Sequence, residues 1–117
     1  MKIDEVLEDL FEMANLRKTE TGLPVNIYVS SGGAIKGRHG PRIKVMYKSS
    51  DKFDINSTVS VLLKKDIDED DVIGYDKLDS NIFNAIKQYL NLNYDCLLEY
   101  WKDDISTMEL MNKLKKI

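Results

Sequence analysis

Apolar residues follow a helical period at the start of the chain. Within residues 1–16 they recur three and four positions apart, and acidic residues fill the opposite side of the same helix. Arg17 and Lys18 come next, where positive charge suits the negative end of a helix dipole. The pattern predicts an amphipathic N-terminal helix over residues 1–16. Its apolar positions are Ile3, Val6, Leu7, Leu10, Phe11 and Ala14.

The period changes to two in the next part of the chain. Apolar and polar residues alternate over residues 25–29 and 43–47, which is typical of strands with one buried side. A third alternating segment covers residues 53–63, with a bulge or short loop near its middle. Val72 and Ile73 predict a short edge strand.

The helical period returns at residue 79. Asp79 and Ser80 are candidates for a helix cap, and apolar residues at helical spacing continue to Trp101. Asn91 and Asn93 weaken the pattern, so residues 79–101 are interpreted as two helices or one bent helix. A further helix has a clear start signal, because Ser106 and Glu109 form a capping box and Ile105 and Leu110 occupy the positions of a hydrophobic staple.

This order of elements predicts a single α+β domain over residues 1–117. A three- or four-stranded, mainly antiparallel sheet occupies residues 23–75, with a Gly-rich basic loop at residues 31–41. The N-terminal helix of residues 1–16 and a C-terminal helical pair in residues 79–117 pack on it.

Composition narrows the class of protein. The chain of 117 residues is 43% hydrophobic and 32% charged, with a net charge of -3, which fits a folded soluble protein. A single cysteine, Cys96, excludes an intramolecular disulfide and every multi-cysteine metal site, and we expect it to be buried and inert. No apolar run is long enough for a membrane span or a signal peptide. We therefore expect a cytoplasmic protein with no membrane partner, no cofactor and no metal.

An acidic run of five carboxylates lies at residues 66–71. Its spacing resembles a calcium loop, but Asp71 stands where the loop needs glycine and Lys77 stands where it needs glutamate. We interpret the run as a solvated turn.

The Gly-rich loop of residues 31–41 is a local basic exception in an acidic protein. It leads into a strand rather than a helix, which excludes a Walker loop and a dinucleotide fingerprint. Free backbone amides and arginine forks can hold a phosphate or a carboxylate. The candidate ligand-binding residues are Lys36, Arg38, Arg42 and Lys44.

Other interpretations of this loop stay open. It could be a polar hairpin connection that keeps the chain soluble, or a contact with a partner protein. His39 has a side chain suited to acid-base chemistry, and it is the candidate catalytic residue only if the protein is an enzyme. No second histidine supports it, so the sequence favours a binding protein.

Two stretches resemble a known family. Residues 38–45 (RHGPRIKV) and the tail from Ala85 through the Leu-Leu-Glu-Tyr-Trp segment to Ile117 are similar to a bacterial family known as a domain of unknown function. The resemblance covers residues 23–117. Its members are often encoded beside a small partner and are suspected of forming toxin-antitoxin-like pairs. Arg42 and Lys44 stand where that family has further histidines, so the resemblance implies anion or carboxylate contact here rather than a metal site.

Two functional hypotheses follow. The first is a small bacterial or phage accessory protein, of a mobile-element or toxin-antitoxin-like type, whose loop contacts RNA, DNA or another phosphate ligand. The alternative is a non-enzymatic protein-binding module, inhibitory or antitoxin-like, that binds a small cognate partner through the loop and the C-terminal helix. The apolar stripe of that helix is Met108, Leu110, Met111, Leu114 and Ile117.

Overall fold

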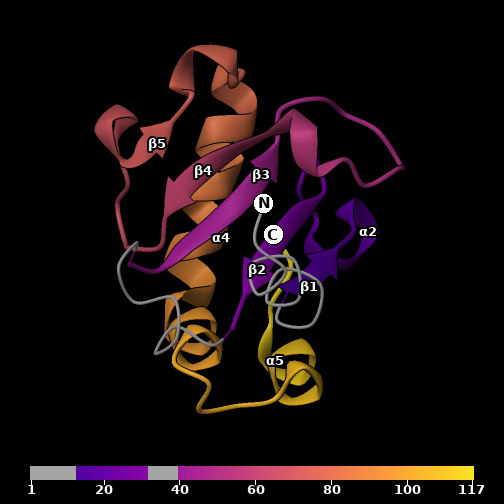
Figure 1. Cartoon of the computed structure of the whole chain (residues 1–117), viewed down its shortest axis with the longest axis vertical. Helices are drawn as coiled ribbons and strands as arrows, with labels where there is room; N and C mark the ends of the chain where they lie inside the picture. The colour runs from indigo at the N-terminus through magenta and orange to yellow at the C-terminus, as the bar shows by residue number, and fades with distance from the viewer. Residues whose placement is uncertain (1–12, 32–39) are drawn as a thin grey trace, which may run out of the picture.

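A computed structural model describes residues 13–31 and 40–117 of the chain (Figure 1). Within these residues, five antiparallel strands form one sheet in the order β1-β2-β3-β4-β5, so each strand pairs with its neighbours in sequence. The strands are β1 (Met13–Leu16), β2 (Ile27–Ser30), β3 (Arg42–Met46), β4 (Thr58–Leu62) and β5 (Val72–Ile73). The helices are α2 (Lys18–Thr21), α4 (Ser80–Trp101) and α5 (Thr107–Lys113), and the 3-10 turns are η2 (Ile55–Ser57), η3 (Glu69–Asp71) and η4 (Tyr75–Lys77).

The α+β class and the antiparallel sheet are confirmed, but the described part of the chain has five strands rather than three or four. The additional strand is β1, so the helix predicted over residues 1–16 is wrong at residues 13–16. Ala14 and Leu16 are buried and pair with β2, while Asn15 between them is exposed. The spacing of Ala14, Asn15 and Leu16 is the apolar-polar-apolar alternation of a strand, although Ala14 also continues the helical spacing of the residues before it. Residues 1–12 of that prediction lie outside the described residues.

The third predicted strand is shorter than its pattern. Residues 53–57 do not pair as a strand, and β4 begins only at Thr58. Asp54 causes this interruption, because its carboxylate accepts hydrogen bonds from the Asn56 amide at 3.0 Å and the Ser57 hydroxyl at 2.8 Å. These bonds cap η2 and end the extended backbone.

Residues 80–101 form the single helix α4, capped by the Asp79 side chain. Asn91 and Asn93 do not break it, because their side chains bind distant segments. Asn91 accepts a hydrogen bond from the Asp66 amide at 2.8 Å, and Asn93 accepts one from the Lys115 amide at 2.8 Å.

The capping box of the last helix is confirmed. The Ser106 hydroxyl accepts from the Glu109 amide and the Glu109 carboxylate accepts from the Ser106 amide, both at 3.1 Å. The helix ends at Lys113, so the predicted apolar stripe is helical only in its first part. The following tail crosses toward α2, where the Ile117 amide donates to the Thr21 carbonyl oxygen at 3.0 Å.

Gly22 allows this close approach of the tail. Its φ of +81° is a left-handed conformation that favours glycine, and a Cβ atom there would overlap the carbonyl oxygen of Ile117.

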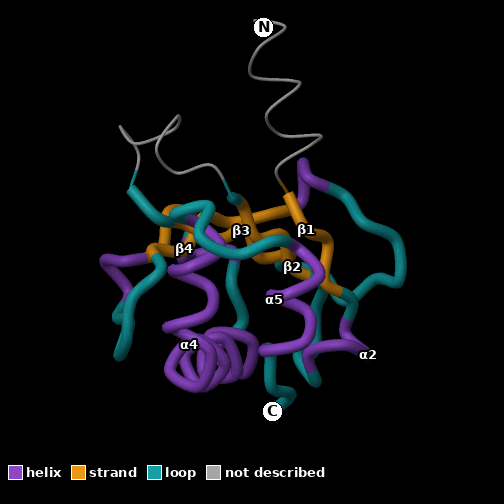
Figure 2. Tube along the Cα trace, turned by 90° about the horizontal axis from the view of Figure 1, so that it is seen from below, coloured by secondary structure: helices purple, strands orange, loops and turns teal. Residues whose placement is uncertain are grey.

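The core lies between the sheet and the C-terminal helices. Alternate strand residues point to one side and are buried, and α4 and α5 lie on that side (Figure 2). No helix in the described residues is long and apolar enough to cross a membrane. The central buried side chains include Ile27, Val45, Val59, Val61, Ile86, Leu90 and Leu97.

One buried hydroxyl lacks a partner. Among the described residues, the Tyr89 hydroxyl is the buried side-chain polar atom with no hydrogen bond, and burial raises the pKa of this group. Its removal in Tyr89→Phe is expected to leave the free energy of unfolding unchanged or to raise it by up to about 1 kcal/mol. Chemical denaturation measures this. Tyr100→Phe is the matched control and should lower stability, because the Tyr100 hydroxyl pairs with the Thr107 hydroxyl at 2.9 Å. A larger loss of stability in Tyr89→Phe than in Tyr100→Phe would show that the Tyr89 hydroxyl does have a stabilising partner.

The acidic run of residues 66–71 is a capped turn. Asp68 and Asp71 form the capping box of η3, and the Asp71 carboxylate also accepts from Lys64 at 3.0 Å. The Asp68 amide and the Lys64 ammonium lower the pKa of Asp71, and the same contact raises the pKa of Lys64.

These contacts predict a pH dependence. Because the pKa of Asp71 is lower in the folded chain than in the unfolded chain, its contribution is present above the unfolded value, near pH 4, and is lost as pH falls through the folded value. The Tm should therefore fall on acidification, and Asp71→Asn should flatten this part of the fall. Equal Tm profiles for both proteins between pH 7 and pH 2 would show that Asp71 contributes nothing.

Candidate functional site

The side of the sheet opposite α4 and α5 carries the second set of strand residues, and we call it the open face (Figure 2). Its side chains differ in exposure: Asn15 and Ile73 are exposed, Lys44 and Ser60 are partly exposed, and Tyr28 is only 5% exposed. Cross-strand register aligns five of them in a row from β1 to β5. These are Asn15, Tyr28, Lys44, Ser60 and Ile73. The alternation of strand residues that buries one side thus brings polar, aromatic and basic side chains together on the other.

Two of the predicted ligand-binding residues belong to this face. Arg42 and Lys44 are two positions apart on β3, so their side chains leave the same side of the strand roughly 7 Å apart along it. The Arg42 guanidinium donates to the Ser60 hydroxyl of β4 at 3.4 Å. Lys44 lies between Tyr28 on β2 and Ser60 on β4. Both cations are partly exposed.

The other predicted site residues are Lys36, Arg38 and His39, and they lie outside the described residues. The segment that contains them connects β2 to β3 and therefore enters β3 at its Arg42 end. The structure brings together Arg42 and Lys44 of the predicted set.

Arg17 and Phe53 are parts of this site that sequence reasoning missed. Tyr28 and Phe53 pack edge to face with ring centroids 5.4 Å apart, and the Arg17 guanidinium carbon lies 6.0 Å from the centre of the Phe53 ring. Burial raises the pKa of Tyr28, and the negative charge of Asp54 adds to the rise. The signal that could have identified Arg17 is the apolar-polar alternation of residues 14–17. If these residues are extended, the side chains of Asn15 and Arg17 lie on the same side of the sheet.

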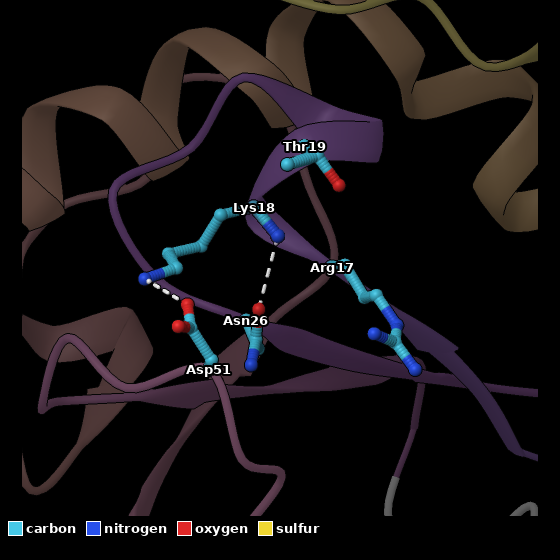
Figure 3. Close-up of a pocket in the computed structure, with 5 residues that line it drawn as sticks. All are labelled: Arg17, Lys18, Thr19, Asn26 and Asp51. Atoms are coloured by element: carbon cyan, nitrogen blue, oxygen red, sulfur yellow. Dashed lines mark hydrogen bonds and ion pairs between the residues drawn. The ribbon is translucent and has the colours of Figure 1, made fainter.

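A pocket of about 320 Å³ lies beside Arg17 (Figure 3). Its polar groups bind one another: the Lys18 amide donates to Asn26 at 2.9 Å, and the Lys18 ammonium pairs with Asp51 at 3.0 Å. Asn26 also donates to the Ser50 carbonyl oxygen at 3.0 Å. We therefore assign this pocket a structural role, because it fixes the loop after β3 against α2.

A second pocket of about 320 Å³ lies at the other end of β3 from Arg42. Met46 and Phe53 supply its apolar wall, and Lys52 is exposed at its rim. The complete lining is Met46, Lys48, Ser50, Lys52, Phe53, Asp54 and Ser57.

Charge is segregated between the two halves of the described structure. Residues 13–31 and 40–65, which include four of the strands, contain eight Lys or Arg and three Asp or Glu. Residues 66–117, which include α4 and α5, contain six Lys or Arg and twelve Asp or Glu. The described residues thus divide into a basic part that contains β1 to β4 and an acidic part that contains α4 and α5.

Metal binding and thiol chemistry can be assessed within the described residues. No group of three or more His, Cys, Asp and Glu in residues 13–31 and 40–117 could hold a metal ion. Cys96 is buried, its thiol donates to the Asn93 carbonyl oxygen at 3.3 Å, and burial raises its pKa, so it is not an activated nucleophile. The open face presents cations beside aromatic rings, an arrangement suited to anions.

Comparisons with protein-family models, curated proteins and solved structures find no significant match. The resemblance of residues 23–117 to a domain-of-unknown-function family therefore stays a prediction.

Proposed function

We propose that the protein is a nucleic-acid-binding domain that contacts the phosphate backbone through its open face. The observation that carries this proposal is the placement of Arg42 and Lys44 on one side of β3, within the basic half of the described structure. An arginine fork can grip phosphate oxygens in pairs and a lysine adds a mobile point charge, so the two act as a backbone clamp.

The net charge of -3 does not oppose this function. Within the described residues, acidic side chains are concentrated in residues 66–117, so the described part of the open face carries mainly positive charge. Screening shortens the reach of the acidic half to roughly 8 Å at physiological ionic strength. Lys36 and Arg38 would extend the contact from the loop that enters β3.

The biological setting that we propose is that of a small bacterial or phage accessory protein of the toxin-antitoxin-like type. In this setting the domain binds nucleic acid without turnover. A nuclease role for His39 would predict RNA cleavage that His39→Ala abolishes.

A salt titration tests the proposed function. Binding of a single-stranded oligonucleotide is followed by fluorescence anisotropy between low and physiological salt. Each phosphate neutralised contributes about -0.7 to the slope of log affinity against log salt. Arg42→Gln/Lys44→Gln should therefore weaken binding and make the slope shallower by about 1.4. No binding at low salt, or an unchanged slope in the variant, would contradict the proposal.

Protein binding through α5 is the second candidate function. Met108 is 76% exposed and Met111 is 38% exposed, whereas Leu110 between them is buried. These two methionines favour a contact surface on the helical side, away from the open face. Met108→Lys separates the two functions, because it should weaken binding of a protein partner and leave oligonucleotide affinity unchanged.

A further inference from the structure

The second pocket lies in line with Arg42 and Lys44 along β3. Arg42, Lys44 and Met46 follow one another on the same side of β3. Met46 therefore lies roughly 7 Å beyond Lys44 and roughly 14 Å beyond Arg42. Met46 lines the pocket, which therefore lies beyond Lys44 at the end of the row of the two cations. A ligand that extends along β3 would meet two cations and then a partly apolar cavity.

The walls of this pocket suit a planar aromatic group. Phe53 is half-buried, and its ring is held by the edge-to-face contact with Tyr28 and by the Arg17 guanidinium, which lies over the ring at 6.0 Å from its centroid. Met46 is 1% exposed and packs behind this wall, so the half-buried Phe53 supplies its accessible part. Rings whose orientation is fixed in this way serve as stacking platforms for nucleobases in proteins that bind single strands.

The polar residues of this pocket supply hydrogen-bonding groups around the apolar wall. Ser57 donates to the Asp54 carboxylate at 2.8 Å, and the Ser50 hydroxyl accepts from the Lys52 amide at 3.2 Å. These bonds fix hydrogen-bonding oxygens around an apolar wall, which is the usual composition of a small-ligand pocket. The exposed Lys52 at the rim can neutralise the phosphate attached to a bound base.

We infer that the ligand is a single-stranded nucleic acid that runs along β3 and inserts one nucleobase beside Phe53. This inference rests on the proposed function, because it uses the same cations for the backbone. It adds a requirement for an unpaired base, since a base stacked inside a duplex cannot enter the pocket. It also distinguishes the protein from a general polyanion binder.

The test compares two probes of equal phosphate number. The first is an oligothymidylate of ten nucleotides, and the second is a strand of the same length whose sugars carry no bases. The full chain should bind the first about tenfold more tightly, because stacking of one base on an aromatic side chain contributes that much or more. Phe53→Leu should remove the difference by weakening only the binding of the base-containing strand.

Two further variants protect this test from a folding defect. Phe53→Tyr retains the ring and should retain the difference between the probes. Phe83→Leu makes the same exchange at the edge-to-face pair of Phe83 with Tyr75 (centroids 5.3 Å apart) and should leave the difference intact. Thermal unfolding of each variant checks that it is folded at the temperature of the assay.

The outcomes separate this inference from the proposed function. Equal, salt-dependent binding of both probes would overturn base insertion while leaving backbone binding in place. Absence of binding to either probe would overturn both. A preference for the base-containing strand that persists in Phe53→Leu would place the base elsewhere and so contradict the pocket assignment.

Discussion

Arg42→Glu/Lys44→Glu is expected to weaken binding of a single-stranded oligonucleotide by about 100-fold or more. The double substitution would replace the two attractive phosphate contacts proposed for β3 by two repulsive charges. The fold should tolerate it, because both side chains are partly exposed and the hydrogen bond of Arg42 to Ser60 is long, at 3.4 Å. Fluorescence anisotropy at constant salt gives the affinities.

The control for this experiment is Lys115→Glu/Lys116→Glu. It changes the net charge by the same amount at two exposed lysines of the C-terminal tail, on the helical side of the molecule. If affinity depends on position, the control should lose much less than the variant of the open face. Equal losses would mean that only net charge matters, which would contradict a defined site.

Asn93→Ala is expected to lower the free energy of unfolding by about 3 kcal/mol. The buried Asn93 amide donates to the Lys115 carbonyl oxygen at 2.9 Å and to the Tyr89 carbonyl oxygen at 3.2 Å, and it accepts from the Lys115 amide at 2.8 Å. Alanine removes all three bonds, including both part-buried bonds to the Lys115 backbone. The tail beyond α5 then loses its anchor, so the amides of Lys115 and Ile117 should exchange with solvent much faster.

Asn91→Ala provides the comparison. Its side chain also binds a distant segment, through two hydrogen bonds to Asp66, but the pair is exposed. Water can replace those bonds, so a loss of about 1 kcal/mol or less is expected. Chemical denaturation measures both variants. An Asn93→Ala protein no less stable than the Asn91→Ala protein would contradict the role of the buried amide.

The sequence pattern of neighbouring residues was enough to predict the elements that depend on short-range interactions. The alternation of Ile43 and Val45 with Arg42 and Lys44 identifies β3. It also places both cations on one side, because every second side chain of a strand points to the same face. The reciprocal hydrogen bonds of Ser106 and Glu109 span three residues and locate the start of α5.

Features that depend on distant partners could not be predicted in this way. Asn93 weakens a helix by propensity, but its hydrogen-bond partner lies 22 residues away. Residues 13–16 form a strand because Ala14 and Leu16 pair with β2, a contact that the helical spacing of the preceding residues obscures. Without that strand, Arg17 is taken for the end of a helix and its position near Phe53 is missed.

The most direct test of the open face as a nucleic-acid interface is a map of amide chemical shifts in the full chain during titration with the ten-residue oligothymidylate. The shifts are expected to concentrate on β2, β3 and β4, with Tyr28, Lys44 and Ser60 among the most affected, and the amides of α4 and α5 should change little. Shifts centred on α4 and α5, or no shifts at a saturating concentration of oligonucleotide, would contradict the interface proposed for this face.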